Sequence, residues 1–335
     1  MQVLVTGAAG FIGMHVALAL LARGETVIGV DSLNDYYDPA LKHARLAVLH
    51  AAASDRFRFA QVDFADHAAL DEALGDAAID RIVHLGAQAG VRYSIENPRA
   101  YVQSNLVGHV NLLEIARHRG VRHLVYASSS SVYGSNASLP FRVEDRVEHP
   151  RSLYAATKRA DELLSESYAH LYRLPQTGLR FFTVYGPWGR PDMAMWIFAD
   201  AIMAGRPLPV FNNGEMARDF TYIEDIVAGV VAALDASPVD DGTEKPGGSL
   251  GPHRLFNIGN NRAEPLERVI DLLAASLGRP ALREYLPMQA GDVPATFADI
   301  GAIERELGFA PRTAIDDGVP RFAQWFLRYT GANRS

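Results

Sequence analysis

A tyrosine and a lysine stand four residues apart in the segment SLYAATKRADELL, residues 152–164, which has the pattern of a beginning helix. Tyr154 and Lys158 at this spacing project from one face of a helix, one turn apart. A nearby ammonium favours the phenolate form of a phenol, whose ordinary pKa is about 10, so the pair could provide a base. Ordinary solvated helices carry the same spacing. The rest of the chain must decide between these interpretations.

The composition limits the class of protein. The chain has 335 residues, enough for one large α/β unit or two joined domains. Its 32 basic and 39 acidic residues give a net charge of −7, which argues against nucleic acid as a main partner. With no cysteine, it has no disulfide, thiolate metal site or cysteine nucleophile. A signal peptide and an apolar run of about 20 residues are both missing, so we expect a cytoplasmic protein with no membrane partner.

Short apolar runs alternate with helical patterns through the first half of the chain. Six of these runs read as strands: QVLVTG, ETVIGVD, FRFAQVD, DRIVHLGA, RHLVYASS and QTGLRFFTVYG. The alternation predicts an α/β fold with a Rossmann-type doubly wound parallel sheet. Long helices are expected within residues 101–120 and 154–173. We assign residues 1–182 to this domain and residues 183–335 mainly to a smaller substrate-binding region, partly interleaved with the first.

Three glycines follow the first predicted strand and open a helix. Gly7, Gly10 and Gly13, in the spacing G-x-x-G-x-x-G, permit a tight turn and let a pyrophosphate approach backbone N–H groups at a helix N-terminus. Asp31 closes the second strand, where an acid binds the ribose hydroxyls of an adenine dinucleotide and repels a 2′-phosphate. The pattern therefore predicts NAD rather than NADP. An aspartate that only caps a turn is the alternative.

Polar residues also end the third and fifth predicted strands. Ser128–Ser131 close the fifth strand, and ligands of open α/β sheets bind beyond the carboxyl ends of the strands. These hydroxyls are therefore expected to face a cofactor and its substrate, although serine clusters are also common in turns. Asp63 ends the third strand and could contact an adenine, with Phe64 beside it. A turn-capping role for Asp63 is equally compatible with the pattern.

In combination, these motifs resemble the extended short-chain dehydrogenase/reductase superfamily, and within it the nucleotide-sugar epimerases. The resemblance runs from residue 2 to about residue 329 and includes the glycine loop, Asp31, the serine-bearing strand, YAATK and RDFTYIEDI, residues 218–226. Four further stretches are most similar to the UDP-glucuronate 4-epimerases: DSLNDYYDPALKHARL, HLGAQAGVRYSIENPRAYVQSN, FFTVYGPWGRPDMA and LPMQAGDVPATFAD. The resemblance implies reversible C4 epimerisation of UDP-glucuronate to UDP-galacturonate, through a 4-keto sugar, with tightly bound NAD.

The resemblance also implies site residues. Tyr154 would act as the base, with Lys158 beside it on the nicotinamide ribose and Ser129 on the sugar O4. The implied cofactor-binding residues are Gly7, Gly10, Phe11, Ile12, Gly13, Asp31, Asn34, Asp63, Phe64, Leu85, Ala87, Gln88, Asn105, Tyr154 and Lys158. The candidates for substrate binding are Arg92, Ser129, Ser130, Thr183, Arg190, Phe211, Arg218, Gln289 and Asp292.

Within the substrate set, the arginines are chosen because a guanidinium fork suits carboxylate and phosphate groups. Arg218 is expected on the diphosphate, Phe211 near the uracil, and Gln289 and Asp292 at the nucleoside end. Thr183 and Arg190 are the candidates for the sugar carboxylate. A surface ion pair is the alternative for each arginine.

Three rival activities remain: UDP-glucuronate decarboxylation, UDP-glucose epimerisation and sugar dehydration. Related decarboxylases and dehydratases carry a glutamate just before VYG, whereas this chain has Ser131 there, after Ser130. We therefore expect the carboxylate to survive the reaction. A non-catalytic NAD-binding protein is the alternative of another class, and the intact set of Ser129, Tyr154 and Lys158 argues against it.

Two further expectations concern metals and assembly. No HExxH motif or paired His/Asp spacing is present, so no metal is implied, and His84 is interpreted as a core histidine. The helices from Tyr101 to Ala116 and from Tyr154 to Tyr172 have more apolar positions than one sheet face needs. They predict a homodimer built on a four-helix bundle.

Overall fold

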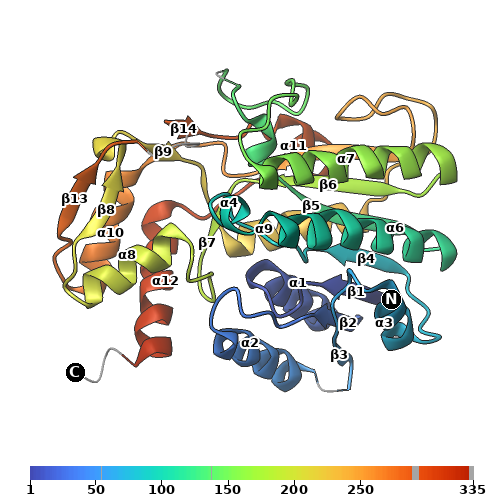
Figure 1. The fold of residues 1–335 in the computed structure, drawn as a ribbon, viewed down its shortest axis with the longest axis horizontal. Helices are drawn as coiled ribbons and strands as arrows, with labels where there is room; N and C mark the ends of the chain where they lie inside the picture. The colour runs from blue at the N-terminus through green and yellow to red at the C-terminus, as the bar shows by residue number, and fades with distance from the viewer. Residues whose placement is uncertain (54, 137, 289–293, 332–335) are drawn as a thin grey trace.

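A seven-stranded sheet in the order β11-β6-β5-β4-β1-β2-β3 forms the centre of the molecule (Figure 1). The computed structural model describes residues 1–53, 55–136, 138–288 and 294–331. The strands are β1 Gln2–Thr6, β2 Thr26–Asp31, β3 Phe57–Gln61, β4 Arg81–His84, β5 His123–Ser129, β6 Gln176–Phe181 and β11 His253–Ile258. All six pairings are parallel. The Rossmann-type fold and the first five predicted strands are confirmed. The sixth predicted strand divides into β6 and a separate short strand, Thr183–Tyr185, outside the central sheet. The strand β11, which follows a segment rich in glycine and proline, was not predicted.

Helices cover both faces of this sheet, as the alternation of strands and helices predicts. One face carries α1 Phe11–Ala22, α2 Pro39–Ala52 and α9 Ile223–Asp235, and the other carries α3 His67–Leu74, α6 Gly108–His118 and α7 Leu153–Tyr172. Successive residues of β1 divide between the two cores, with Val3 and Val5 on the first face and Leu4 on the second. The sheet is therefore buried on both sides.

The two long helices differ in regularity. The α7 helix begins after Ser152, whose Oγ accepts a hydrogen bond from Ala155 N at 3.1 Å, as an N-cap does. The other predicted helix is divided. Following the short helix α4 Tyr93–Glu96, α5 Pro98–Tyr101 continues through a π-helical segment, η1 Val102–Val107, into α6. The π-helical segment carries Asn105, and such segments often occur at functional sites.

Outside the central sheet, the strands of the second half are only two to four residues long, and many elements of this half lie at one end of the molecule (Figure 1). Its strand pairs are β7 Thr183–Tyr185 with β10 Phe220–Tyr222 and β8 Leu208–Phe211 with β13 Arg283–Leu286. A three-stranded sheet has β9 Ala217–Arg218 between β12 Glu264–Pro265 and β14 Ala295–Thr296. Besides α9, the helices of this half are α8 Ala194–Met203, α10 Leu266–Leu277, α11 Gly301–Leu307 and α12 Ile315–Thr330. Short 3-10 turns are η2 Ser130–Tyr133, which follows β5, and η3 Asn212–Gly214, which follows β8.

Two elements of the second half, β11 and α9, belong to the central sheet and its covering layer. The domain boundary between residues 182 and 183 stays a prediction. Within the part of the chain that the structure describes, no helix is long and apolar enough to cross a membrane.

Candidate active site

A cavity of about 500 Å³ lies at the carboxyl ends of the central strands, where open α/β sheets bind their ligands. Both halves of the chain contribute to its walls. Eighteen of the predicted site residues line it: Gly7, Gly10, Phe11, Ile12, Gly13, Asp31, Asn34, Phe64, Leu85, Ala87, Gln88, Ser129, Ser130, Tyr154, Lys158, Thr183, Arg190 and Arg218. Motifs that are far apart in the sequence therefore meet in one place.

The glycine loop between β1 and α1 is closely packed against backbone. Gly7 has a φ of 68°, and its carbonyl accepts a hydrogen bond from Gly10 N at 2.8 Å. A Cβ on Gly13 would lie 2.0 Å from Gly7 O, and one on Gly7 would lie 2.8 Å from the amide nitrogen of Gly86. Side chains cannot fit at these positions. The N-terminus of α1 is thus left accessible to a phosphate group.

Asp31, at the end of β2, is buried and held by two backbone amides. Its Oδ2 accepts a hydrogen bond from Ala9 N at 3.1 Å, and its Oδ1 accepts one from Leu33 N at 2.9 Å. Burial raises the pKa of this carboxyl, and the two amide bonds and the charge of Lys42 oppose that effect only in part. Asp31 therefore caps a turn and also lines the cavity, a position that is compatible with both interpretations of the sequence.

Two residues predicted to bind the cofactor lie outside the cavity lining. Asp63 is exposed, and its Oδ1 accepts a hydrogen bond from Ala65 N at 2.9 Å, so the turn-capping alternative describes its contacts. Asn105 is buried behind the wall. Its side chain accepts from Gln88 N at 2.8 Å and donates to Gln88 O at 3.0 Å. Asn105 thus orders the cavity residue Gln88 instead of lining the cavity itself.

Tyr154 and Lys158 lie on the first turns of α7, facing the serines that end β5. Lys158 is almost fully buried, and its Nζ donates to Asp161 Oδ2 at 2.9 Å. Ser129 Oγ accepts hydrogen bonds from the backbone amide of Ser131 at 3.2 Å and from its hydroxyl at 2.9 Å. The helix therefore brings Tyr154 and Lys158 to the same cavity as a hydroxyl cluster.

The serines of this cluster are not equivalent. Ser128 Oγ donates to Glu162 Oε1 at 2.6 Å, and Glu162 also accepts two hydrogen bonds from the buried guanidinium of Arg180. Ser128 is therefore committed to a buried ion pair. Ser129 and Ser130 remain the better-placed hydroxyls for a sugar.

Arg190 already has a carboxylate partner. Its Nε and Nη2 donate to the two oxygens of Asp192 at 2.9 and 2.6 Å, and Tyr36 Oη donates to Asp192 Oδ2 at 3.2 Å. Burial alone would raise the pKa of Asp192, but the charge of Arg190 and the hydrogen bonds that Asp192 accepts together hold that pKa below its ordinary value. A sugar carboxylate would therefore meet a guanidinium whose charge is largely balanced. Arg190 therefore forms an ion pair, but this pair lies beside the cavity and not on the outer surface.

The residues predicted for the nucleotide end are only partly assembled. Arg218, on β9, lines the cavity and donates to the carbonyls of Ala217 and Pro294 at 3.0 and 3.1 Å. The Arg92 guanidinium lies 5.4 Å from the ring centre of Phe211, and both residues are outside the cavity lining. Gln289 and Asp292 lie outside the described residues.

Residues 3–259 match the model of the NAD dependent epimerase/dehydratase family. The chain belongs to this family. A probable UDP-glucuronate 4-epimerase of Rhizobium meliloti is 47% identical, with 97% of this chain and 97% of that protein aligned. UDP-glucuronate 4-epimerase 1 of Arabidopsis thaliana is 45% identical, covering 99% of this chain and 78% of the plant protein. Among solved structures, UDP-glucuronic acid 4-epimerase from Bacillus cereus, in complex with UDP-glucuronic acid and NAD, matches with a TM-score of 0.86, 32% identity and coverage of 98% of this chain and 100% of that one.

Two basic residues of this family member were not predicted from the sequence. Arg45, fully buried on α2, donates to Ala9 O at 2.9 Å, to Tyr37 Oη at 2.6 Å and to Trp188 O at 2.7 Å. It thereby connects the glycine loop to the segment that precedes Arg190. Lys42 Nζ donates to the backbone and side chain of Asn34 at 2.6 and 2.7 Å. The sequence signal that could have identified Lys42 and Arg45 is the presence of two cations, three residues apart, on a face of α2 that is otherwise apolar.

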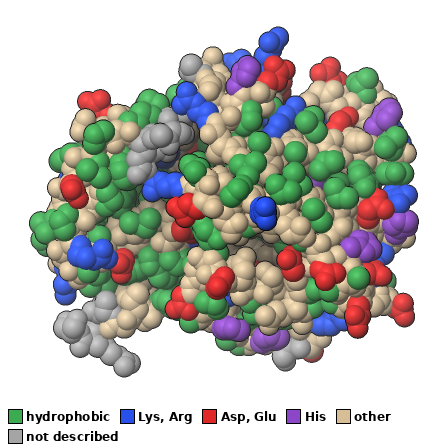
Figure 2. Space-filling model, in the orientation of Figure 1, with side chains coloured by type: hydrophobic (Ala, Val, Ile, Leu, Met, Phe, Trp, Pro, Cys, Tyr) green, Lys and Arg blue, Asp and Glu red, His purple; other side chains and the backbone are tan. Residues whose placement is uncertain are grey.

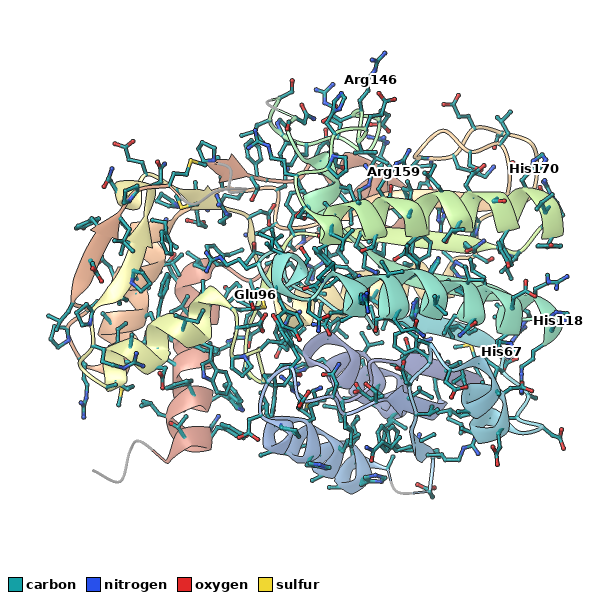
Figure 3. All side chains as sticks on the ribbon, viewed as in Figure 1. His67, Glu96, His118, Arg146, Arg159 and His170 are labelled. Carbon is teal, nitrogen blue, oxygen red and sulfur yellow. The ribbon has the colours of Figure 1, made fainter. Side chains whose placement is uncertain are left out.

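A surface hollow away from the family's cavity contains two histidines. His67 and His118 come from α3 and α6 (Figure 3) and line this hollow. The carboxylates of Asp71 and Glu114 there are bound to arginines at 2.6 and 2.8 Å. Among the described residues, no group of three or more histidines and carboxylates is placed to hold a metal ion.

Proposed function

We propose that the protein is an NAD-dependent UDP-glucuronate 4-epimerase, which interconverts UDP-glucuronate and UDP-galacturonate. The observation that carries this proposal is the meeting of the glycine loop, the Tyr154–Lys158 pair, Ser129, Arg190 and Arg218 around one cavity. The names of the relatives support the same substrate. We place the enzyme in the cytoplasm, because a chain without cysteine suits a reducing compartment.

The cavity fits NAD by its chemistry. The glycine loop presents backbone amides where a side chain would collide, and this suits the pyrophosphate. Asp31 offers carboxylate oxygens to the adenine ribose, at the end of the second strand. When bound, NAD accepts the hydride from C4 of the sugar and returns it, so it is unchanged after a cycle.

The remaining steps belong to the chain's own residues. Tyr154 removes the O4 proton while the C4 hydride leaves, and a 4-keto sugar results. The ammonium of Lys158 favours the phenolate form of Tyr154, and Ser129 holds O4 with its hydroxyl. After the sugar turns its other face, Tyr154 returns the proton to O4. The configuration at C4 is thereby inverted.

Thr183 and Arg190 are proposed to hold the uronate carboxylate. A guanidinium has five N–H donors, and Asp192 engages only the Nε and Nη2 groups of Arg190. The other donors can therefore serve a second carboxylate without breaking the first pair. Asp192 fixes the plane of the guanidinium, which orders it before the sugar arrives.

Oxidation at C4 of a glucuronate gives a β-keto acid, which tends to lose carbon dioxide. Among the described residues that line the cavity, Asp31 is the only acid, and it lies on β2 rather than beside the sugar-binding serines. Ser130 and Ser131 stand where the decarboxylases and dehydratases carry acids. With no acid to assist elimination or enolate protonation there, return of the hydride is expected to be faster than decarboxylation.

Product analysis tests the proposal. Purified protein is incubated with UDP-glucuronate, and separately with UDP-glucose, without added NAD, and the products are separated and weighed by mass spectrometry. UDP-galacturonate, of unchanged mass, is the expected main product, with at most a trace of UDP-pentose. Predominant loss of carbon dioxide would assign the protein to the decarboxylases, and turnover of UDP-glucose alone would assign it to the neutral-sugar epimerases.

We also propose that the enzyme is a homodimer formed by α6 and α7. Hydrophobic side chains spread over the face that these helices form (Figure 2). Leu163 and Leu171 on α7 are 55% and 62% exposed, and Val107, the last residue of η1, is 39% exposed. A second copy would cover them as a four-helix bundle. Leu163→Arg should yield monomer in light scattering at micromolar concentration, whereas Val239→Arg, at an apolar residue in the loop after α9, should stay dimeric. A wild-type monomer would contradict this proposal.

A further inference from the structure

The lysine next to Tyr154 has a buried counter-ion on the same helix. Lys158 and Asp161 are one turn apart on α7, their side chains are 2% and 0% exposed, and the Nζ–Oδ2 distance is 2.9 Å. The other oxygen of Asp161, Oδ1, is buried and has no hydrogen-bond partner in the described part of the chain. A buried carboxylate with one oxygen unsatisfied costs free energy. Stability alone does not account for this aspartate.

The histidines that face the pair from other elements are uncharged at neutral pH. His84 on β4 and His109 on α6 stack with their ring centroids 5.4 Å apart. Burial lowers the pKa of His109 to about 4, and it lowers that of His84 well below its ordinary value. The charge of Lys158 lowers both further. Neither histidine can serve as a charged partner.

The other titratable groups near the pair are also accounted for. Burial raises the pKa of Tyr126, on β5, well above its ordinary value, so its phenol stays neutral. Glu162 is bound by Arg180 on β6, with N–O distances of 2.8 and 3.0 Å. Within the described residues, Asp161 is therefore the carboxylate that balances the Lys158 ammonium.

We propose that Asp161 is a positioning residue for the epimerisation, which keeps the Lys158 ammonium protonated and fixed beside Tyr154. This inference rests on the proposed function. Asp161 touches neither the sugar nor the reacting atoms, and it acts through the lysine. Lys158 can favour the phenolate of Tyr154 only while it carries its charge.

Two electrostatic effects of Asp161 oppose one another. Its negative charge weakens the field of Lys158 at Tyr154, and it also offsets the desolvation of the buried ammonium. The second effect dominates, because the carboxylate contacts Lys158 directly, whereas Tyr154 lies one further helical turn away. Burial without a partner lowers the pKa of a lysine by up to about 3–5 units. Without Asp161, the Lys158 ammonium would be buried with no carboxylate at hydrogen-bond distance among the described residues, which disfavours its charged form.

The pH profile of kcat tests this role. Asp161→Asn keeps the size and removes the charge, so the alkaline limb of the profile should move down by at least about one pH unit. Asp161→Glu should restore the wild-type limb. The control is Ser165→Ala, one turn further along α7, which removes the hydrogen bond to His109 at 2.9 Å without changing a charge. Its alkaline limb should coincide with that of the wild type. An unshifted limb in Asp161→Asn would overturn the proposal.

A double-mutant cycle of melting temperatures tests the coupling of Lys158 and Asp161 even if Asp161→Asn folds poorly. Melting temperatures are measured for Lys158→Met, Asp161→Asn and the double variant. Each single change leaves one buried charge or polar group without its partner, so the double variant should melt above Lys158→Met. A double variant that melts below both single variants would refute the coupling. This cycle needs no turnover, so an inactive wild type would reject the proposed function, while the cycle would still test the coupling between Lys158 and Asp161.

Discussion

The two walls of the cavity are built in different ways. The wall proposed for the cofactor consists of strand ends and a glycine loop in close backbone contact, with a Cβ on Gly13 only 2.0 Å from Gly7 O. The wall proposed for the sugar consists of side chains from separate short elements, such as Thr183 on β7, Arg190 in the following loop and Arg218 on β9. The first wall would bind its ligand mainly through the shape of the backbone, which few substitutions can alter. The second would bind its ligand through side chains, so substitutions there can alter which sugar is accepted.

The largest expected effect comes from a substitution that removes catalysis but leaves the binding of NAD and UDP intact. Tyr154→Phe removes the phenol hydroxyl and little else, so kcat should fall by at least about 10²-fold. NAD should remain bound at the wild-type ratio, because the glycine loop is untouched, and UDP affinity should persist. Activity is measured with UDP-glucuronate, and bound NAD is measured after denaturing the protein. More than about a tenth of the wild-type kcat would remove Tyr154 from the role of base.

Lowering the pH should reduce the stability of the first half of the chain, which carries the wall proposed for the cofactor. Burial lowers the pKa of His109 to about 4 and that of His123 to about 3. Because the unfolded chain takes up these protons near the ordinary value of about 6.5, stability is complete above that pH and is lost as pH falls through it. Between pH 7 and pH 5 the loss is about 2 kcal/mol for each histidine.

Urea unfolding at the two pH values measures the acid effect, and hydrogen exchange locates it. The variant His123→Gln should reduce the pH dependence, while the control His43→Gln, at an exposed residue of α2, should keep it. If hydrogen exchange increased first in α8 and α12, the second half of the chain would be the less stable half in acid, contrary to this prediction.

A single methyl group should be enough to damage the cofactor wall. Gly13→Ala would overlap Gly7 O, and relief of such overlap typically costs about 1–3 kcal/mol. We expect a lower melting temperature and a protein purified with little NAD. Gly251→Ala is the matched control, since its Cβ would have Ser249 Oγ as nearest atom, at an ordinary 3.6 Å. Equal NAD content in the two variants would show that the loop is less constrained than its geometry indicates.

The smallest expected effect concerns the sugar wall. Arg190→Ala should reduce kcat/KM for UDP-glucuronate by about tenfold more than it weakens UDP binding, because the uronate loses a charged hydrogen-bond donor. Arg142→Ala serves as the control, since Arg142 is 66% exposed and lies 3.7 Å from Asp299. Both constants are measured by steady-state kinetics and by calorimetry with UDP. Equal losses for UDP-glucuronate and UDP-glucose would place Arg190 on the diphosphate.

The sequence predicted the two walls with unequal success. The glycine loop, Asp31 and the Tyr154–Lys158 pair all line the cavity as expected, because each depends on spacing within one strand, turn or helix. Asp63 and Asn105, which were also expected to bind the cofactor, lie outside the lining. A residue type at the end of a strand or within a helix does not reveal which way its side chain turns.

By itself, the amino-acid sequence determined the alternation of strands and helices in the first half, the glycine turn after the first strand and the one-turn spacing of Tyr154 and Lys158. These features arise between neighbours in the chain, where backbone geometry leaves few choices. Only the tertiary structure decided that Arg190 shares Asp192 with Tyr36, that Arg45 joins the two walls, and that Asp161 balances Lys158. The partner of a charge depends on which groups folding excludes from water together, and in the first two cases those groups come from segments far apart in the sequence.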